Sequence, residues 1–253
     1  MGPSAVEVEL NAKEDAMIKK ILLALTCVIA INAESTSLMT AKSWSVADAN
    51  GKVLHSNNAG ELRSIASISK LMTVMIVLDA QQDPNEYFKP YTRQELIQLA
   101  LVKSDNVAAQ TLCNNYPGGK ETCVRAMNQK ARDLDMPETK FIEPTGLSVM
   151  NISTASELVK LVLASANYPE IVEASHTAQG KIKTKKSWQT FNNTNPIVNK
   201  YNFIVSKTGY IRASGGCIVM MLDTALGRRI VVLLGSQSTH TRIPEAEFVS
   251  KLF

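Results

Sequence analysis

Histidine is scarce in this 253-residue sequence, and its distribution argues against metal-dependent chemistry. The three histidines, His55, His176 and His240, are scattered along the chain. They lack the close spacing of a metal-ligand set. We therefore expect no metal ion and no other cofactor.

Long apolar runs are equally scarce. The run 21–31 follows two lysines and precedes the small residue Ala33. It is too short to span a bilayer comfortably, and its layout is that of a secretory signal. We expect a signal peptide at 17–33, with a buried helix or an uncleaved anchor as the alternatives. Residues 1–16, polar and acidic, form an N-terminal extension of uncertain origin.

Cysteine is too rare for a disulfide framework. If cleavage follows Ala33, an odd number remains, namely Cys113, Cys123 and Cys217. Cys113 and Cys123 flank a turn-like segment and can be bridged in an oxidising compartment, but the sequence does not fix their separation. Cys217 lies in an apolar run and is expected to be a buried, inert thiol.

Internal repeats, long linkers and shifts in composition are also missing. With 45% hydrophobic and 20% charged residues, the chain can bury a full core and is not disordered. One domain at 34–253 is the economical interpretation. The net charge of +4 is typical of a soluble, mildly basic surface, so we expect no nucleic-acid partner.

Hydrophobic patterning predicts strands at both ends of this domain and helices between them. A hairpin is expected at 43–49 and 52–56 around Asn50-Gly51, followed by a buried helix at 65–78. Capping-box patterns at Thr92 and Thr154 predict two amphipathic helices, at 96–101 and 158–163. The last part predicts three adjacent antiparallel strands at 203–206, 217–222 and 229–235, and a closing helix at 244–253. The fold class is α+β.

Ser67 and Lys70 carry the most informative signal, because a spacing of three places them on one face at a helix start. Alone, such a pair is usually a helix cap followed by a solvated lysine. Here Ser104-Asp105-Asn106 and then Lys207-Thr208-Gly209 follow in order. This set of three motifs is the signature of class A β-lactamases and penicillin-binding proteins, so the sequence resembles both groups. It predicts acyl transfer through a serine.

Each motif residue meets a separate chemical need. Ser67 is a weak nucleophile until a base takes its proton, and Lys70 can be that base where it is partly neutral. Burial and a second cation, Lys207, favour the neutral form. Ser104 is a candidate proton relay, and Asn106 a candidate holder of the substrate amide or of Lys70.

The third motif has the features of a substrate-binding strand. Thr208 offers a hydroxyl to a substrate carboxylate, and Gly209 lets a substrate backbone lie close to the strand edge. The backbone N–H groups of Ser67 and Tyr210 are candidates for an oxyanion hole, a role that typically contributes about 2.7–4 kcal/mol per donor.

Four segments extend the resemblance across the chain, namely 65–73, 116–119, 143–148 and 206–210. With them the sequence resembles the low-molecular-mass penicillin-binding proteins of the D-alanyl-D-alanine peptidase family, and within it the endopeptidases most. The resemblance implies a β-lactamase/DD-peptidase-like fold, an antiparallel sheet of about five strands flanked by a mostly helical region.

The resemblance also implies the activity and the partners. We expect an acyl-enzyme on Ser67, hydrolysis of peptidoglycan peptide bonds after D-alanine, and acylation by penicillin. Partners would be stem peptides and their cross-links, with β-lactams as covalent inhibitors, in the periplasm. Arg242 lies where relatives hold the terminal carboxylate of the substrate, although by its own surroundings in the sequence it could equally be a surface arginine.

Two departures and two rival functions remain. Segment 81–91 is shorter than in the endopeptidases, and no second β-domain or anchor helix follows Arg242, which predicts at most peripheral membrane contact.

Glu143 stands roughly where a class A β-lactamase carries its deacylating glutamate, but the expected asparagine after it is absent. The other rival is a non-catalytic peptidoglycan binder. The motifs do not separate endopeptidase from carboxypeptidase.

Overall fold

The computed structural model describes residues 39–184 and 187–253. The chain divides into Met1–Met39 and a compact unit, Thr40–Phe253, which holds every helix and strand described below. The expected extension at 1–16 and signal peptide at 17–33 lie outside the described residues.

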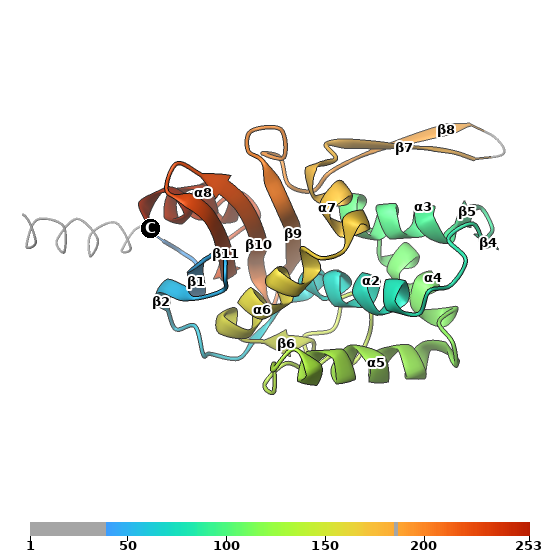
Figure 1. Ribbon diagram of the computed structural model, residues 1–253, viewed down its shortest axis with the longest axis horizontal. Helices are drawn as coiled ribbons and strands as arrows, with labels where there is room; N and C mark the ends of the chain where they lie inside the picture. The colour runs from blue at the N-terminus through green and yellow to red at the C-terminus, as the bar shows by residue number, and fades with distance from the viewer. Residues whose placement is uncertain (1–38, 185–186) are drawn as a thin grey trace, which may run out of the picture. The chain divides into compact units, whose positions relative to one another are not determined.

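A five-stranded antiparallel sheet forms one part of this unit (Figure 1). Its order is β2-β1-β11-β10-β9. The strands are β1 (Ser43–Asp48), β2 (Val53–Asn57), β9 (Phe203–Ile211), β10 (Gly215–Thr224) and β11 (Gly227–Ser236). The predicted hairpin and the three predicted C-terminal strands are confirmed, and the latter are longer than expected. Strand β9 lies at an edge of the sheet, and its outer side is therefore available to other elements.

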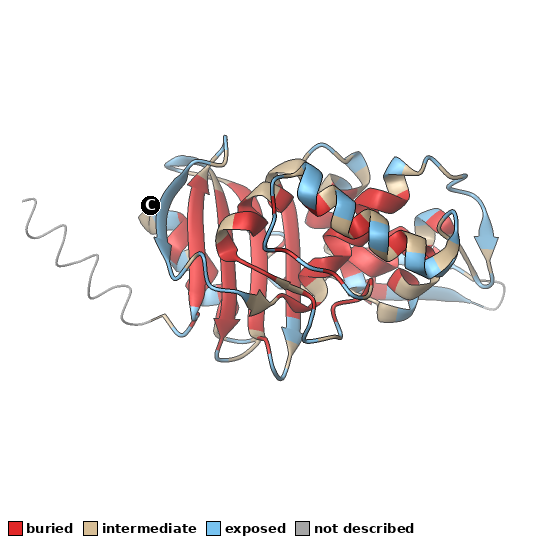
Figure 2. Cartoon of the chain, turned by 90° about the horizontal axis from the view of Figure 1, so that it is seen from below, coloured by how far each residue is buried: buried red, intermediate tan, exposed pale blue. Residues whose placement is uncertain are grey.

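The central strands are buried on both faces, as Figure 2 shows. Helices α6 (Ala155–Ser165) and α8 (Arg242–Leu252) both pack on β10 and β11. A strand covered on both faces needs a nearly continuous apolar run, and the segment 230–234 supplies one.

The mostly helical region lies between the two groups of strands in sequence. It contains α2 (Ser69–Asp79), α3 (Arg93–Gln98), α4 (Asn106–Asn114), α5 (Gly119–Asp133), α6 and α7 (Pro169–His176). Helix α2 is buried from Ser69 to Val77, because α4, α5 and α6 pack around it. The predicted helix at 65–78 is correct in place but begins differently, since the 3-10 turn η1 (Ala66–Ile68) precedes the α-helix.

The two capping patterns have different outcomes. Thr92 and Glu95 form a complete capping box at the start of α3. After α3 the chain continues as a π-helical turn, η2 (Leu99–Lys103), rather than as the predicted α-helix. Thr154 caps α6 by accepting from the backbone N of Glu157, but the Glu157 carboxylate turns away to accept from Glu138 N.

Three small sheets were not predicted from the sequence. They pair β3 (Arg63–Ser64) with β6 (Ile152–Ser153), β4 (Tyr87–Phe88) with β5 (Tyr91–Thr92), and β7 (Gln179–Lys183) with β8 (Trp188–Asn192). The two-residue strands are too short to show a period. Hairpin β7–β8 extends along the helical region in Figure 1.

The structure settles the question of the cysteines. Cys113 and Cys123 form a disulfide between α4 and α5, with their Cα atoms 5.5 Å apart. Cys217 is a fully buried free thiol, as predicted. Among residues 39–184 and 187–253, no helix is both long enough and apolar enough to cross a membrane.

Candidate active site

The turn before α2 exposes the side chain of Ser67 from an otherwise buried segment. Ile65, Ala66 and Ile68 are fully buried, whereas Ser67 is partly exposed. Ala66 has φ of +46°, a left-handed conformation that is unusual for a residue with a side chain. The hydroxyl of Ser69 donates to the Ala66 carbonyl at 2.8 Å and holds this conformation. The nucleophile candidate is therefore rigidly presented.

Lys70 lies one turn further along the helix and is fully buried. Its Nζ donates three hydrogen bonds, to Ser67 Oγ at 2.8 Å, Asn106 Oδ1 at 2.7 Å and the Thr145 carbonyl at 2.7 Å. Three acceptors use all three protons of an ammonium group. When Lys70 is neutral, its lone pair has Ser67 Oγ within proton-transfer distance.

The surroundings of Lys70 bring its titration close to neutral pH. Burial lowers the pKa of Lys70 from 10.5 to about 8, against the opposing effect of the Glu143 and Asp105 carboxylates, which raise it. A base is most effective when its pKa lies near the working pH. Lys70 thus combines the geometry and the acidity that a general base requires.

The second motif is positioned by a change of backbone direction. Ser104 ends the π-helical turn in a left-handed conformation, with φ of +60°. Asp105 then caps α4 by accepting from Ala108 N at 3.0 Å. Asn106 begins α4 and reaches Lys70, whereas the Ser104 hydroxyl accepts from Lys207 Nζ at 2.9 Å. The three residues of this motif therefore have three different local tasks.

Lys207 lies on β9 and is buried, with 1% of its surface exposed. Besides Ser104 Oγ, its Nζ reaches the Thr208 carbonyl at 3.1 Å. Burial, followed by the nearby charges of Lys70 and Arg242, holds the pKa of Lys207 well below its usual value. Lys207 thus lies near Lys70, but the lowering of the Lys70 pKa comes from burial and not from Lys207 as expected.

The edge strand β9 passes directly against the nucleophile turn. A Cβ added to Gly209 would lie 3.0 Å from both the Ile65 carbonyl and the Ser67 backbone N, so only glycine allows this approach without a shift of the turn. The Thr208 hydroxyl donates to Thr194 Oγ1 at 2.6 Å. The Tyr210 side chain is half exposed. Gly209 therefore brings Tyr210 and the Ser67 backbone into one small region.

Arg242 is the first residue of α8, so this helix begins two residues earlier than predicted. It is not a surface arginine, since only 7% of it is exposed. Its Nη1 donates to the Gly209 carbonyl at 2.7 Å, and its buried Nε has no hydrogen-bond partner among the described residues. Burial lowers the pKa of Arg242. The structure thus places this cation against the same strand as Lys207.

The segment 143–148 lies on the other side of the site from β9, and its contacts account for its residue types. The Glu143 carboxylate accepts from Thr145 N, Thr145 Oγ1 and Gly146 N, at 2.7, 2.6 and 2.6 Å. Gly146 has φ of +80°, and a Cβ there would collide with the backbone of Ala66. Glu143 folds the loop that presents the Thr145 carbonyl to Lys70. This structural role argues against Glu143 as a deacylating base.

Asn151 was not singled out from the sequence and connects this loop to the nucleophile turn. Fully buried, it donates from Nδ2 to Ser69 Oγ at 2.9 Å and to the Glu143 carbonyl at 2.8 Å. The backbone carbonyl of Asn151 accepts from the backbone N of Ile65 at 3.0 Å. A lone asparagine between two predicted elements carries no motif, and only its contacts reveal its role.

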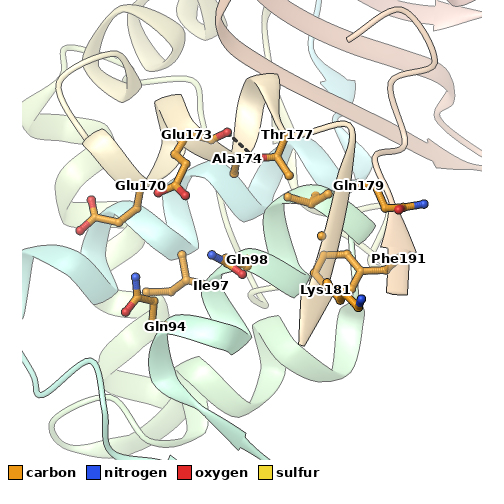
Figure 3. A pocket seen from close by; sticks show the side chains of 12 residues that line it. Gln94, Ile97, Gln98, Glu170, Glu173, Ala174, Thr177, Gln179, Lys181 and Phe191 are labelled. Atoms are coloured by element: carbon orange, nitrogen blue, oxygen red, sulfur yellow. Dashed lines mark hydrogen bonds between the residues drawn. The ribbon is translucent and has the colours of Figure 1, made fainter. Parts of the chain in front are cut away.

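One hollow adjoins the predicted site residues, and a second hollow lies apart from them. One, of about 680 Å³, begins at Asn106 and Thr145 and runs along α4. The other, of about 220 Å³, lies between α3, α7 and the β7–β8 hairpin, where Gln94, Glu173 and Phe191 line it (Figure 3). None of the predicted site residues lines this second hollow. The described residues contain no cluster that could hold a metal ion.

Comparison with known families now places the chain. The model of the family described as D-alanyl-D-alanine carboxypeptidase, peptidase family S11, matches residues 30–90 and 85–238. The chain belongs to this family. A protein of Escherichia coli named D-alanyl-D-alanine endopeptidase is 40% identical to the chain, over 72% of this chain and 66% of the relative. A protein of the same name from Pseudomonas aeruginosa is 37% identical, over 78% of this chain and 71% of the relative. The chain spans about two thirds of the length of the first of these.

Solved structures agree with the fold. Penicillin-binding protein D2 from Listeria monocytogenes, in its ampicillin-bound form, has a TM-score of 0.75 at 24% identity, covering 85% of this chain and 97% of that one. The Streptomyces K15 DD-transpeptidase has a TM-score of 0.73 at 20% identity, covering 84% and 96%. The predicted β-lactamase/DD-peptidase-like fold is confirmed, and so is the D-alanyl-D-alanine peptidase family that the four matching segments indicated.

Proposed function

We propose that this S11 protein is a serine-type D-alanyl-D-alanine peptidase that cleaves peptidoglycan peptides through an acyl-enzyme on Ser67 and is acylated by β-lactams. The observation that carries the proposal is the hydrogen bond from Lys70 Nζ to Ser67 Oγ, with the pKa of Lys70 lowered to about 8. At pH 7 roughly a tenth of such a lysine is neutral, which is enough to serve as a base.

The reaction begins with attack of Ser67 Oγ on the carbonyl carbon of a D-alanine residue. The Ser67 proton passes to neutral Lys70, and the negative charge on the carbonyl oxygen is stabilised by the backbone N–H groups of Ser67 and Tyr210. Asn106 keeps Lys70 oriented and faces the substrate amide. Water then hydrolyses the ester and regenerates the Ser67 hydroxyl.

The departing amine needs a proton as the C–N bond breaks. Ser104 is suited to deliver it, because its hydroxyl accepts from Lys207 Nζ at 2.9 Å and can pass a proton on. The proton that Lys70 took from Ser67 replaces the one given up by the Ser104–Lys207 pair, so both lysines return to their starting states. A carboxylate on the leaving side would lie near Lys207, the Thr208 hydroxyl and Arg242. The partly unsatisfied Arg242 guanidinium supports this assignment.

Endopeptidase action on cross-linked peptides is the favoured specificity. The support is the 37–40% identity to the relatives that bear this name. The groove beside Asn106 also leaves room for a branched peptide. The Glu143 carboxylate accepts hydrogen bonds from its own loop and is therefore not placed to activate a water for rapid hydrolysis of the acyl-enzyme. This disfavours the β-lactamase alternative.

Secretion to the periplasm is part of the proposal. The pattern at 17–33 supports export, and the Cys113–Cys123 disulfide supports an oxidising compartment, since such bonds are rare in the cytosol.

The deciding experiment digests purified cross-linked muropeptide dimers beside a pentapeptide monomer that ends in D-Ala-D-Ala, with products identified by mass spectrometry. Conversion of dimers to monomers is the expected result. Loss of the terminal D-alanine alone would make the enzyme a carboxypeptidase. If neither substrate is cleaved while penicillin still labels Ser67, the protein is a binder or a β-lactamase, and the release rate of the acyl group separates these two.

A further inference from the structure

The segment between β8 and β9 holds one threonine against the strand of the third motif. The hydroxyl of Thr208 on β9 donates to Thr194 Oγ1 at 2.6 Å. Thr208 is buried, with 3% of its surface exposed, whereas Thr194 is partly exposed. The backbone N of Thr194 donates to the Val102 carbonyl at 3.1 Å, within the π-helical turn that leads to Ser104. Thr194 therefore connects the strand of the third motif to the turn that carries the second.

An asparagine on each side fixes the position of Thr194. Asn193 Nδ2 donates to the Thr177 carbonyl at the end of α7, at 2.9 Å. Asn195 is buried, and its Nδ2 donates to Ser206 Oγ on β9 at 2.8 Å. The segment is thus attached to α7 on one side of Thr194 and to β9 on the other. The Thr194 hydroxyl consequently has a defined place.

The hydrogen bond between the two hydroxyls restricts what Thr208 can offer to a substrate. A hydroxyl has one proton to donate and two lone pairs that accept. In the free protein, the Thr208 proton is directed at Thr194 Oγ1. If Thr208 turned this proton to a substrate carboxylate and nothing else changed, two oxygens 2.6 Å apart would face each other without a proton between them, which is unfavourable. The contact remains favourable only when Thr194 becomes the donor.

We propose that Thr194 is a positioning residue for the substrate carboxylate on the leaving side of the scissile bond. In the complex, the Thr194 hydroxyl donates to Thr208 Oγ1, and Thr208 donates to the carboxylate. A hydroxyl that accepts one hydrogen bond is a stronger donor in the next, and a charged acceptor strengthens that bond further. The inference rests on the proposed function for the presence of the carboxylate. It adds a residue that none of the three motifs contains.

The test compares acylation by benzylpenicillin, which has a free carboxylate, with acylation by its methyl ester. Thr194→Val removes the hydroxyl and keeps the shape of the side chain. We expect it to lower the second-order acylation rate for benzylpenicillin about five- to tenfold, and to leave the rate for the ester within about twofold of the wild-type value. Thr194→Ser keeps the hydroxyl and should react with both compounds like the wild-type protein. Thermal midpoints control for folding.

A double substitution shows whether Thr194 acts through Thr208. Thr208→Val should lower the rate for benzylpenicillin at least as much as Thr194→Val does. Adding Thr194→Val to it should lower the rate by less than about a further twofold, because the partner of the hydroxyl is already gone. The matched control is Thr190→Val, which removes an exposed threonine hydroxyl of β8 and should change neither rate.

Several results would overturn the assignment of Thr194. They are a wild-type rate for benzylpenicillin in Thr194→Val, equal losses for the acid and the ester, a Thr194→Ser variant as slow as Thr194→Val, and losses from Thr194→Val and Thr208→Val that multiply in the double variant. Equal losses would mean that Thr194 only supports the fold. A wild-type protein that reacts with neither compound would refute the proposed function itself, and this assignment with it.

Discussion

The candidate active site has two sides, the helical wall (α2, α4 and segment 143–148) and the sheet wall (β9), and the buried lysine of each has different surroundings. In the helical wall, Lys70 donates to three oxygen acceptors and lies near the carboxylates of Asp105 and Glu143. In the sheet wall, Lys207 has only a hydroxyl and its neighbour's carbonyl, and its charged neighbours are cations.

This contrast assigns different tasks to chemically identical side chains. In the helical wall, burial lowers the pKa of Lys70 to about 8 and the carboxylates of Glu143 and Asp105 limit the fall, so this lysine can give and take a proton near neutral pH. In the sheet wall, burial and the nearby charges of Lys70 and Arg242 disfavour the charge on Lys207. A bound carboxylate would reverse this, because an opposite charge restores the protonated form. We therefore expect Lys207 to act as the electrostatic partner of the substrate and Lys70 as the base.

The largest expected effect comes from removing the nucleophile that both walls serve. Ser67→Ala should reduce acylation by penicillin at least a thousandfold, because no other side chain is placed to form the ester. The fold should be nearly unchanged, since Ser67 is partly exposed and small. Intact-mass spectrometry after incubation with penicillin measures the adduct, and the thermal midpoint controls for folding. Labelling at the wild-type rate would remove the assignment of Ser67.

Lys207→Ala separates the tasks of the two walls. We expect acylation by penicillin and cleavage of peptide to fall together, by about 10²–10⁴-fold, because one cation attracts the carboxylate of both substrates and holds the Ser104 hydroxyl. Second-order acylation rates and peptide kcat/KM measure the two effects. If only one substrate is affected, Lys207 serves that substrate's recognition alone and the contrast between the walls is wrong.

Gly146→Ala tests how firmly the helical wall depends on its loop. A Cβ at Gly146 meets the Ala66 backbone, which cannot move without moving Ser67. We expect a loss of about 2–4 kcal/mol in the free energy of unfolding, measured by denaturant titration, and a slower acylation. Gly60→Ala is the control, since a Cβ there has no atom within 4 Å. Equal stability of the two variants would contradict the role given to Gly146.

Sequence alone identified the motif residues but not the contacts that align them. Ser67, Ser104 and Lys207 follow from spacing, because each motif is local and names particular side chains. The Thr145 carbonyl, the third acceptor of Lys70, is 75 residues away and is a backbone group that any residue could supply. Asn151 escaped notice for a related reason, since its role depends on contacts with Ser69 and Ile65, which are far away in sequence.

In the fold, too, local features were predicted and features that depend on distant contacts were not. Long apolar strands and the hairpin around Asn50-Gly51 were predicted, because period and turn chemistry are local properties. The left-handed Ala66 and the π-helical turn before Ser104 were not predicted, because no local pattern of residues marks either conformation. The sequence neighbours of Arg242 do not determine whether its side chain is exposed or buried. Its burial depends on the distant Gly209, whose carbonyl it contacts.

The smallest expected effect concerns the charge that distinguishes the helical wall. Asp105 raises the pKa of Lys70, so Asp105→Asn should lower that pKa. Because neutral Lys70 is the base, the acylation rate rises with pH through about 8, and this midpoint should move to lower pH by less than about one unit. Asparagine preserves the cap of α4, so folding should not change.

The pH dependence of the second-order acylation rate measures this shift. Lys103→Gln is the matched control, because it breaks the exposed ion pair with Asp105 but leaves the carboxylate charge in place. It should not lower the midpoint. A midpoint that stays fixed in Asp105→Asn, or moves to higher pH, would mean that Lys70 does not control the profile. The base would then have to be sought at Lys207 of the sheet wall and its hydrogen-bond partner Ser104, and the tasks assigned to the two lysines would be exchanged.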